Sequence, residues 1–419
     1  MKKTTPPFFK AIMNNVFGIL PVIILLFFVC TFTISHVHAD ESRSIRIPMD
    51  ASVMDSVFVL VDNDLIATYG GRSSPMAITV SRLDGSHYKS IPLTNEKMRL
   101  ESMTISDGRV FYTEYDTSEP WYSRNQTVYA FDLTTEEKQI LFTTPVVPNV
   151  QQKITRIVAD GGHVALYKEG GGHSVILYTI STGSIQVIIR SYSGIHGLAL
   201  DGNHLMWGCE RTDREPGREI HVYTISSGED WIIPESKSIK TWGYGDISGN
   251  RIVWDMATSD PDTSAGYPDL INAGDTIYMT DTTTGKTVSI ESVNAPARPF
   301  ISGEKIVYIK KPEQDYDNPG NGVIRTFDIA SGSFNEFGSE IAYIQGVRGN
   351  IIIWGRYNPM SFFATTLDGT VPSPVTRETI RADIPVSNPT PAESPVGPLL
   401  VVSAITTGAI GFIIFNKRR

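Results

Sequence analysis

Acidic residues gather in two of the longer segments that connect predicted strands. Asp260 and Asp262 are separated by one residue, and so are Asp315 and Asp317. Calcium takes about six to eight oxygen ligands, and alternating aspartates begin many calcium loops. Neither segment carries the remaining ligands of such a loop, so solvated carboxylates are the simpler interpretation. We therefore predict no cofactor and keep calcium as the alternative.

A second group of reactive side chains lies where the predicted innermost strands begin. Its members are cations, aromatic residues and one carboxylate: Glu101, Arg156, His196, Tyr244, Arg298 and Tyr343. If these strands converge on one axis, the side chains meet at the entrance of a central channel. Cations beside aromatic rings suit an anionic or carbohydrate ligand. The alternative is that they pack against neighbouring repeats or line a water-filled hole.

Motifs of the common catalytic sites are missing. Gly285-Lys286-Thr287 ends like a phosphate-binding loop, but Thr280 stands where that motif needs its first glycine. Gly172-His173-Ser174 lacks the glycine of a nucleophile elbow. The histidines beyond the N-terminal segment show no paired metal-ligand spacing: His87, His163, His173, His196, His204 and His221. The sequence therefore predicts neither catalytic residues nor a metal site.

Composition excludes further classes of protein. The chain has 419 residues with 36 Lys and Arg against 45 Asp and Glu, and this net charge of −9 argues against a nucleic-acid partner. Two cysteines rule out a disulfide scaffold. Cys209 lies beside Trp207 on a predicted strand, and we interpret it as a small buried hydrophobe rather than a reactive thiol.

A strand–turn–strand block recurs along the chain. Ile247–Trp254 reads ISGNRIVW, and Ile301–Tyr308 reads ISGEKIVY. The turn position of the block falls at residues 63, 107, 161, 202, 249, 303 and 349, at spacings of 44, 54, 41, 47, 54 and 46 residues. A period of about 40–50 residues is typical of propeller blades. We predict an all-β protein, a seven-bladed β-propeller of four-stranded blades over residues 44–369; a linear solenoid of hairpins is the alternative.

Two details of the repeats predict how the ring closes and packs. The last repeat runs into prolines at 372 and 374, which cannot donate to a ladder, so residues 44–48 are predicted to supply its outer strand. One repeat position carries a large aromatic side chain in most copies, and we interpret this set as core between blades rather than as a sugar platform: Tyr112, Trp207, Trp254, Tyr308 and Trp354.

Both ends of the chain have the composition of membrane-targeting segments. Residues 1–39 resemble an export signal, with cleavage after Ala39 or an uncleaved signal anchor as the two outcomes. Residues 370–396 are a Pro-rich stalk, 397–415 a transmembrane helix and 416–419 a cytoplasmic basic tail. Without the six basic residues of the signal and the tail, 30 basic residues face 45 acidic ones, a net charge of −15. Asn125 opens an N-glycosylation sequon.

The repeats resemble those of TolB-like β-propellers, in particular of archaeal cell-surface proteins. The resemblance rests on ISGNRIVW and on IYMTDTTTGK at Ile277–Lys286. It implies a fold, whereas propellers host unrelated activities. With both ends considered, we predict a non-enzymatic, membrane-anchored extracellular module that binds a protein or glycan of the cell envelope. The alternative is an extracellular carbohydrate-active enzyme such as a propeller polysaccharide lyase.

Overall fold

The computed structural model describes most of the predicted propeller. The described residues are 44–47, 58–69, 77–120, 124–145, 147, 150, 152–191, 194–210, 217–239, 244–257, 275–293, 297–311, 322–341, 343–357 and 360–372. They all belong to the first of two compact units, Met1–Pro374; the second is Val375–Arg419. The predicted signal, the transmembrane helix and tail, nearly all of the stalk and both acidic segments lie outside the described residues.

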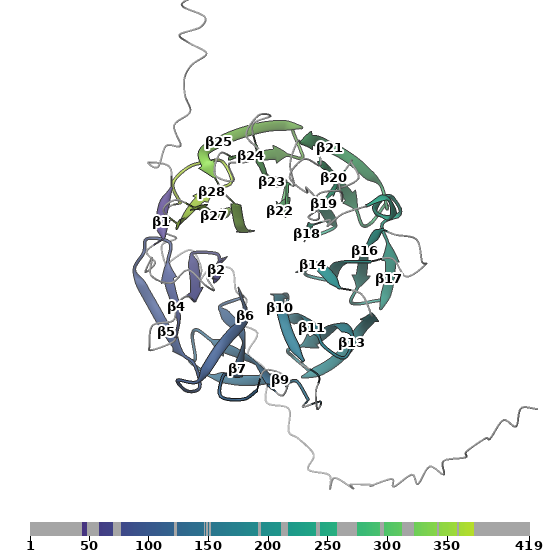
Figure 1. Cartoon of the computed structure of the whole chain (residues 1–419). Helices are drawn as coiled ribbons and strands as arrows, with labels where there is room; N and C mark the ends of the chain where they lie inside the picture. The colour runs from purple at the N-terminus through teal and green to yellow at the C-terminus, as the bar shows by residue number, and fades with distance from the viewer. Residues whose placement is uncertain are drawn as a thin grey trace, which may run out of the picture. The chain divides into compact units, whose positions relative to one another are not determined.

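The described strands form seven four-stranded antiparallel sheets around a common centre (Figure 1). Blades one to three contain β2 (Phe58–Asp62), β3 (Leu65–Tyr69), β4 (Ala77–Arg82), β5 (His87–Pro92); β6 (Met98–Ser106), β7 (Arg109–Asp116), β8 (Gln126–Asp132), β9 (Lys138–Thr143); and β10 (Lys153–Asp160), β11 (His163–Glu169), β12 (His173–Thr179), β13 (Ser184–Ser191). Blades four to six contain β14 (Ile195–Asp201), β15 (His204–Glu210), β16 (Arg218–Thr224), β17 (Glu229–Ile232); β18 (Gly245–Ser248), β19 (Arg251–Ala257), β20 (Asp275–Asp281), β21 (Thr287–Val293); and β22 (Phe300–Ser302), β23 (Lys305–Lys310), β24 (Gly322–Asp328), β25 (Ser333–Ile341). Blade seven contains β26 (Tyr343–Arg348), β27 (Ile351–Tyr357), β28 (Met360–Thr366) and β1 (Ile45–Ile47).

The predicted seven-bladed propeller is therefore confirmed, and one short 3-10 helix, η3 (Pro234–Ser238), adjoins blade four. Within the described part of the chain, no helix has the length and apolar character needed to cross a membrane.

The turn between the first two strands of each blade has the same backbone geometry in all seven copies. The residue at the predicted turn position has a φ between 53° and 59° at Asn63, Asp107, Gly161, Gly202, Gly249, Gly303 and Gly349. Glycine, asparagine and aspartate tolerate this left-handed region best, which explains the glycine in five copies and the Asn and Asp in the other two. The repeat seen in the sequence is thus a repeated tight hairpin.

The ring closes as predicted, through the N-terminal strand. β1 pairs with β28 in the register Ile45↔Ala364 and Ile47↔Phe362, and it becomes the outer strand of blade seven. Ile47 is 4% exposed and packs in one cluster with Val59 of blade one. Closure by the two ends of the propeller chain leaves no open blade between blades one and seven.

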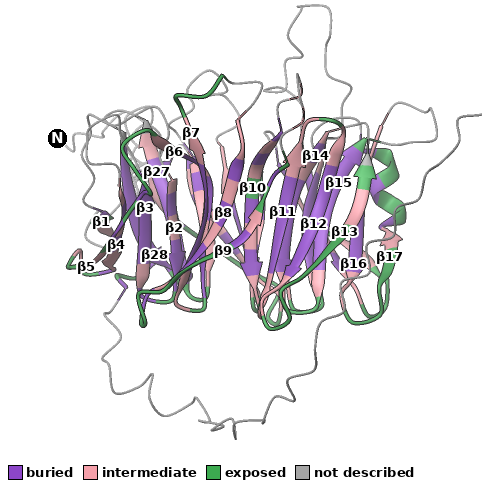
Figure 2. Ribbon diagram, turned by 90° about the horizontal axis from the view of Figure 1, so that it is seen from below, coloured by how far each residue is buried: buried purple, intermediate pink, exposed green. Residues whose placement is uncertain are grey.

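The core lies between adjacent blades, and the aromatic residues of the repeat form much of it. Tyr112, Trp207, Trp254 and Tyr308 are fully buried and Trp354 nearly so, which confirms the prediction of inter-blade core. Trp254 stacks on Tyr278 at a centroid distance of 4.6 Å and donates a 2.9 Å hydrogen bond from Nε1 to Thr280 Oγ1. Figure 2 shows buried residues along the middle of the strands and exposed hairpin turns at one end.

Candidate functional site: the two ends of the central channel

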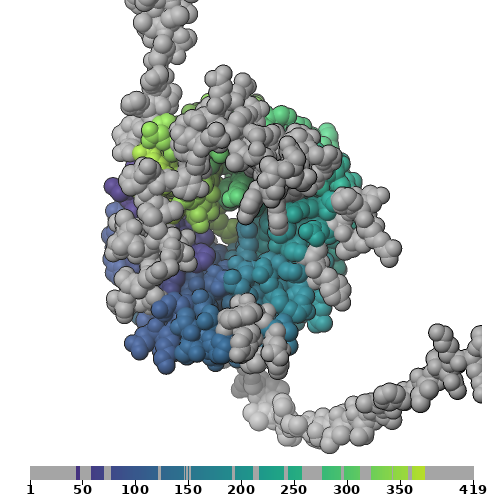
Figure 3. Space-filling view, viewed as in Figure 1, coloured from purple at the N-terminus to yellow at the C-terminus, as the bar shows by residue number. Residues whose placement is uncertain are grey.

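The first strand of every blade lines the centre of the ring. β2, β6, β10, β14, β18, β22 and β26 each contact the inner strand of the next blade, and β26 contacts β2. The space-filling view is hollowed at this centre (Figure 3). Because every blade repeats the same chain direction, all inner strands begin at one end of the channel, here named the loop end. They finish at the tight hairpins, and that end is named the turn end.

A cation stacks on an aromatic ring at the loop end. The Arg298 guanidinium lies over the Tyr244 ring, 4.5 Å from its centroid, and Nη2 is 3.5 Å from the Tyr244 hydroxyl. Tyr244 precedes β18 and Arg298 precedes β22, so the pair joins blades five and six. Arg298 is exposed and Tyr244 half-buried. The guanidinium therefore keeps hydrogen-bonding capacity for a ligand.

A buried carboxylate holds this pair in place. Asp255 of β19 is 1% exposed, and it accepts a 2.6 Å hydrogen bond from the Tyr244 amide and a 3.0 Å bond from the Arg298 amide. Arg298 adopts a φ of 44°, a conformation that costs free energy in a residue other than glycine. Asp255 thus ties the entrances of two blades together and holds Arg298 in a strained backbone geometry.

Arg156 approaches the same site from across the channel. It belongs to β10 of blade three, yet its charge interacts with Tyr244 and Asp246 of blade five. Burial within the ring lowers the pKa of Arg156, while Asp246 and Tyr244 oppose that shift. Burial and the nearby charge of Arg298 also lower the pKa of Lys311. The loop end therefore gathers cations on a chain that is acidic as a whole.

Asp246 lies along the channel between the two ends. It accepts a 3.1 Å hydrogen bond from the Ile301 amide, and its charge interacts with both Arg348 and Arg156. Burial raises the pKa of Asp246 to about 6, against the opposing effects of backbone hydrogen bonds and these two arginines. A carboxyl group with such a pKa gains or loses a proton close to neutral pH.

The turn end is tied together by hydrogen bonds between neighbouring blades. Asp160 accepts a 2.6 Å bond from the Gly202 amide, Asp201 accepts one from Gly249, and Ser248 accepts a 3.1 Å bond from Gly303. Each bond joins the inner strand of one blade to the hairpin of the next. The same repeat position therefore links blades three to six.

Arg348 crosses the turn end. It donates a hydrogen bond from Nη2 to Asp160 Oδ1, which joins blade seven to blade three on the other side of the ring. Burial alone would lower the pKa of Arg348, but the charges of Asp160, Asp201 and Asp62 raise it. Burial, with the neighbouring Asp160 charge, raises the pKa of Asp201. Arg348 is thus the central counter-ion of an acidic ring.

The structure brings together three of the six residues predicted at the channel entrance: Arg156, Tyr244 and Arg298. The other three have different surroundings. Glu101 is paired with Lys153 at 2.5 Å. Tyr343 packs edge-on against Phe362, with ring centroids 5.9 Å apart, in the core between blades seven and one.

His196 lies beside His173 of blade three and Arg218 of blade four. Burial, followed by these two neighbouring charges, lowers the pKa of His196 to about 4, so its ring is neutral at physiological pH. Asn125 of the predicted sequon is half-buried immediately before β8, and its glycosylation stays a prediction.

Sequence reasoning missed the buried Asp255, the channel carboxylate Asp246 and the crossing Arg348. A signal for Asp255 and for Arg348 was present in the repeats. Asp255 follows the core aromatic at a position where the other repeats have small, hydroxyl-bearing or apolar residues. Arg348 replaces the Asp or Ser that precedes the turn in the other blades. Departures from a repeat are therefore better indicators of a site than the residues that resemble the consensus.

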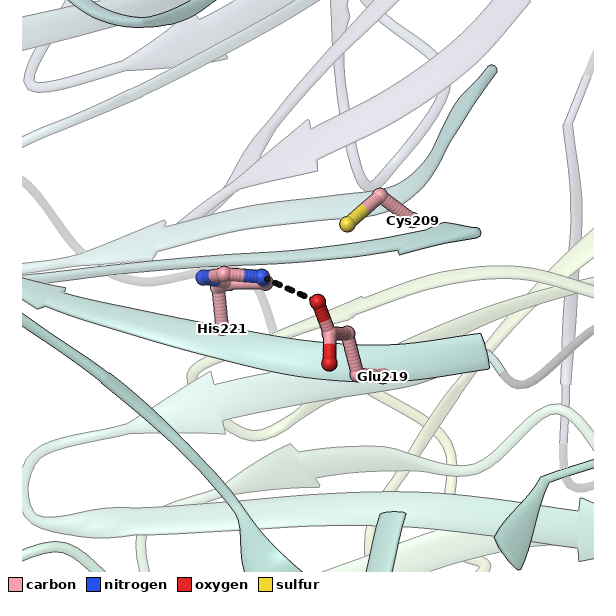
Figure 4. Close-up of side chains that lie close together, drawn as sticks. All are labelled: Cys209, Glu219 and His221. Atoms are coloured by element: carbon pink, nitrogen blue, oxygen red, sulfur yellow. Dashed lines mark hydrogen bonds and ion pairs between the residues drawn. The ribbon is translucent and has the colours of Figure 1, made fainter. Parts of the chain in front are cut away.

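A separate cluster lies within blade four, away from the channel. Cys209, Glu219 and His221 place their ligand-type atoms within 4.8 Å of one another, and all three residues are buried (Figure 4). Burial alone would lower the pKa of His221, yet hydrogen bonds with Asp230 and Cys209 raise it to about 10. Cys209 is 2% exposed, as predicted for a buried thiol. The predicted absence of a metal site stays a prediction. Spacing along the chain does not reveal this cluster, because Glu219 is two residues from His221 on β16 and Cys209 comes from the adjacent strand β15.

Comparison with known proteins supports the fold. No protein-family model matches the chain, and no curated protein does either. Among solved structures, the tricorn protease is similar with a TM-score of 0.53 and 13% identity, over 80% of this chain and 36% of that one. An oligogalacturonate lyase from Vibrio parahaemolyticus is similar with a TM-score of 0.50 and 10% identity, over 77% of this chain and 90% of that one.

TolB from Acinetobacter baumannii is also among the similar structures, with a TM-score of 0.38 and 12% identity over 74% of this chain and 78% of that one. At such identities a likeness carries the fold alone. The tricorn protease and the Vibrio lyase support the fold, and they indicate neither an activity nor an archaeal cell-surface type.

Proposed function

We propose that the propeller is a non-enzymatic binding module that holds an acidic glycan at the loop end of its channel. The observation that carries this proposal is the Arg298–Tyr244 stack, clamped by the buried Asp255, with Arg156 facing it. A guanidinium donates paired hydrogen bonds to a carboxylate, and an aromatic face packs against a sugar ring. The strained backbone at Arg298 also favours a role in binding over one in packing.

The charge distribution supports an anionic ligand. The chain carries a net charge of −9, so its overall field repels anions. Arg156, Arg298 and Lys311 nevertheless gather at one end of the channel, where burial within the ring lowers the pKa of Arg156 and, with the nearby charge of Arg298, that of Lys311. A carboxylate-bearing ligand would relieve this local repulsion.

The sequence adds a location to this proposal. The expected export signal over residues 1–39, the stalk over 370–396 and the transmembrane helix over 397–415 would hold the propeller outside the cell, on the cell membrane, with the basic tail inside. In this setting the partner is an envelope glycan, and an envelope protein that presents acidic side chains is the competing partner. The archaeal cell-surface type, indicated by the repeat motifs, belongs to the same proposal.

Titration calorimetry of the full chain tests the binding proposal. We expect a hexuronate oligosaccharide to bind and a neutral hexose oligosaccharide of equal length to bind at least about 10-fold more weakly, since a hydrogen bond to a charged group contributes about 1.5–3 kcal/mol. Arg298→Met should reduce affinity by a similar factor. Arg251→Met is the matched control, because Arg251 is paired with Glu304 at 2.5 Å beside the tight hairpins of blades five and six, at the opposite end from Arg298. Equal binding of both sugars would contradict the proposal.

A polysaccharide lyase is the second candidate, and Asp246 is the observation that favours it. A carboxyl group with a pKa raised to about 6, close to Arg156, is suited to accept a proton from a sugar whose carboxylate the arginine neutralises. Incubation with polyuronates, followed by ultraviolet absorbance of unsaturated products, distinguishes the two functions. Unsaturated product that forms with the natural chain and is lost in Asp246→Asn would establish the lyase. Binding without product would support the non-enzymatic binding module.

A further inference from the structure

The cluster inside blade four has the composition of a transition-metal site. We name it the blade-four cluster; it consists of Cys209 on β15, Glu219 and His221 on β16, and Asp230 on β17. Glu219 lies directly opposite Cys209 in the strand register. Glu219 and His221 are two residues apart on one strand, so their side chains share a face of the sheet. The β-ladder therefore brings a thiol, a carboxylate and an imidazole together on a rigid element.

The spacing of these side chains fits a small divalent ion. His221 Nε2 and Glu219 Oε1 are 3.2 Å apart, and two ligands of a tetrahedral zinc ion, each at about 2.0 Å from it, are about 3.3 Å apart. The sulfur of Cys209 is within 4.8 Å of the other two atoms and faces them in Figure 4. Cys209, Glu219 and His221 are 2%, 7% and 8% exposed. Three protein ligands leave a fourth position for water.

Asp230 and Trp207 hold His221 in the orientation that a ligand needs. Both carboxylate oxygens of Asp230 lie 3.1 Å from His221 Nδ1, on the side of the ring opposite Glu219. A proton on Nδ1 directed at a carboxylate leaves the Nε2 lone pair toward Glu219 and Cys209, as in metal sites where a carboxylate supports the histidine. The Trp207 indole stacks on His221 at 5.1 Å with an interplanar angle of 9°, which fixes the plane of the imidazole.

The other blades show that this set is not a requirement of the fold. At the equivalent positions blade five has Met256, Thr276 and Tyr278. In blade two the aromatic pair is instead covered by Lys138, whose Nζ is 3.9 Å from the Tyr129 centroid. Among the described residues, the blade-four cluster is where three potential metal ligands of the His, Cys and carboxylate types meet. An imidazolium between Glu219 and Asp230 is the metal-free alternative, and it requires no thiol.

We propose that Cys209, Glu219 and His221 bind a zinc-type divalent cation, with Asp230 as the hydrogen-bond partner that orients His221. On binding, Cys209 loses its thiol proton and His221 loses any proton on Nε2, both to solvent, while Nδ1–H stays directed at Asp230. The thiolate and two carboxylates then carry three negative charges around one divalent ion. A soft sulfur ligand with an imidazole favours zinc or cobalt over calcium or magnesium. This site is independent of the channel and of the function proposed for it.

Metal content and cobalt spectroscopy of the full chain test the proposal. After incubation with zinc and gel filtration, we expect about one zinc per chain by mass spectrometry of the metal. Cobalt in its place should give a tetrahedral visible spectrum and a sulfur-to-cobalt charge-transfer band. Cys209→Ser should abolish that band, and Asp230→Asn should weaken zinc binding by about 10–100-fold while Cys209 and the band remain. Cys30 is unchanged in every variant, so it cannot account for these differences.

His173→Gln is the matched control, because His173 is a half-buried histidine on a strand of blade three that bonds to Tyr167 at 2.7 Å without a thiol beside it. It should bind zinc as the natural chain does. If Cys209→Ser fails to fold, the metal-free natural chain, melted with and without zinc, gives the answer, since a bound ion raises Tm. Absence of bound zinc in the folded natural chain would overturn the site. So would zinc binding by Cys209→Ser and Asp230→Asn that equals that of the natural chain.

Discussion

The two ends of the central channel are formed by opposite ends of the same inner strands, and they are organised in different ways. At the turn end every acidic side chain has an assigned partner: Asp160 bonds to Gly202 and to Arg348, and Asp201 bonds to Gly249. At the loop end the partners hold the backbone instead, because Asp255 binds the amides of Tyr244 and Arg298 and leaves their side chains toward the channel. The first arrangement stabilises the ring, and the second presents functional groups.

Interactions that recur in several blades and interactions that occur once have different roles in this ring. Hydrogen bonds that recur from blade to blade, such as those at Gly202, Gly249 and Gly303, maintain the ring. A buried charge that occurs once, such as Asp255, positions one particular pair of side chains. Four predictions test the contrast, in order of decreasing effect.

Both ends of the channel depend on a closed ring, so the largest effect is expected from opening it. Deletion of residues 44–47 removes β1 and exposes β28, with Phe362 and Phe363, as a free edge. We expect a loss on the order of 4 kcal/mol in the free energy of unfolding, from lost burial and lost ladder hydrogen bonds. Thermal denaturation followed by circular dichroism measures it. An unchanged melting temperature would show that β1 does not close the ring.

The second prediction compares one arginine from each end. Arg348→Met leaves Asp160, Asp201 and Asp62 without their shared counter-ion, and we expect a loss of about 2 kcal/mol, below the value for a fully buried ion pair because Arg348 keeps some contact with solvent. Arg298→Met should change stability by less than about 0.5 kcal/mol. Urea denaturation of both variants gives the difference. Equal losses in the free energy of unfolding of Arg348→Met and Arg298→Met would contradict the distinction between a structural turn end and a ligand-binding loop end.

The third prediction concerns the pH dependence that Asp246 contributes. The pKa of Asp246 is raised to about 6 in the folded protein, above its ordinary value near 3.8, so the folded state binds this proton more tightly than the unfolded state between about pH 4 and pH 6. The carboxylate therefore disfavours folding above pH 6, and that penalty disappears as the pH falls to 4.

Asp246→Asn should consequently be more stable than the natural chain at pH 7, by on the order of 1 kcal/mol, and this advantage should vanish at pH 4. Asparagine can still accept the hydrogen bond from the Ile301 amide through its side-chain oxygen. Parallel urea denaturation at the two pH values gives the comparison. If Asp246→Asn were more stable than the natural chain by the same amount at pH 7 and at pH 4, the pKa of Asp246 would not be raised in the folded protein.

The smallest effect is expected from relief of backbone strain at the loop end. Arg298 has a φ of 44°, which glycine adopts without cost, so Arg298→Gly should raise stability by about 0.5 kcal/mol, net of the greater entropy of the unfolded glycine. It should also abolish the stack on Tyr244 and lower affinity for an acidic sugar. A variant that is less stable and binds equally well would place Arg298 among the structural residues.

The ring of seven blades could be predicted from the sequence because the repeated hairpin has the same backbone conformation in every blade. Seven turn residues require the same positive φ, and their spacing alone counts the blades. The outer strand of blade seven followed from the prolines at 372 and 374, which left residues 44–48 as the remaining strand-like segment, of which 45–47 form β1. Local chemistry therefore determined the fold.

Only three of the six residues predicted at the channel entrance come together, and irregularities in the inner strands explain part of the difference. Tyr244 and Arg298 precede strands without irregularity, so counting back from the turn places them in the channel. Glu101 lies within a register irregularity between Leu100 and Met103, and His196 borders one between His196 and Ala199. A bulge adds a residue and redirects the side chains before it. Contacts across the ring, such as Arg348 with Asp160, have no signature in sequence spacing.

The structure of the full chain bound to a hexuronate trisaccharide would show directly which end of the channel binds a ligand. We expect the sugar at the loop end, with a carboxylate within about 3 Å of the Arg298 or Arg156 guanidinium and a ring against Tyr244. A sugar bound at the turn end beside Arg348, or on the outside of the blades, would contradict the assignment of the loop end as the binding site.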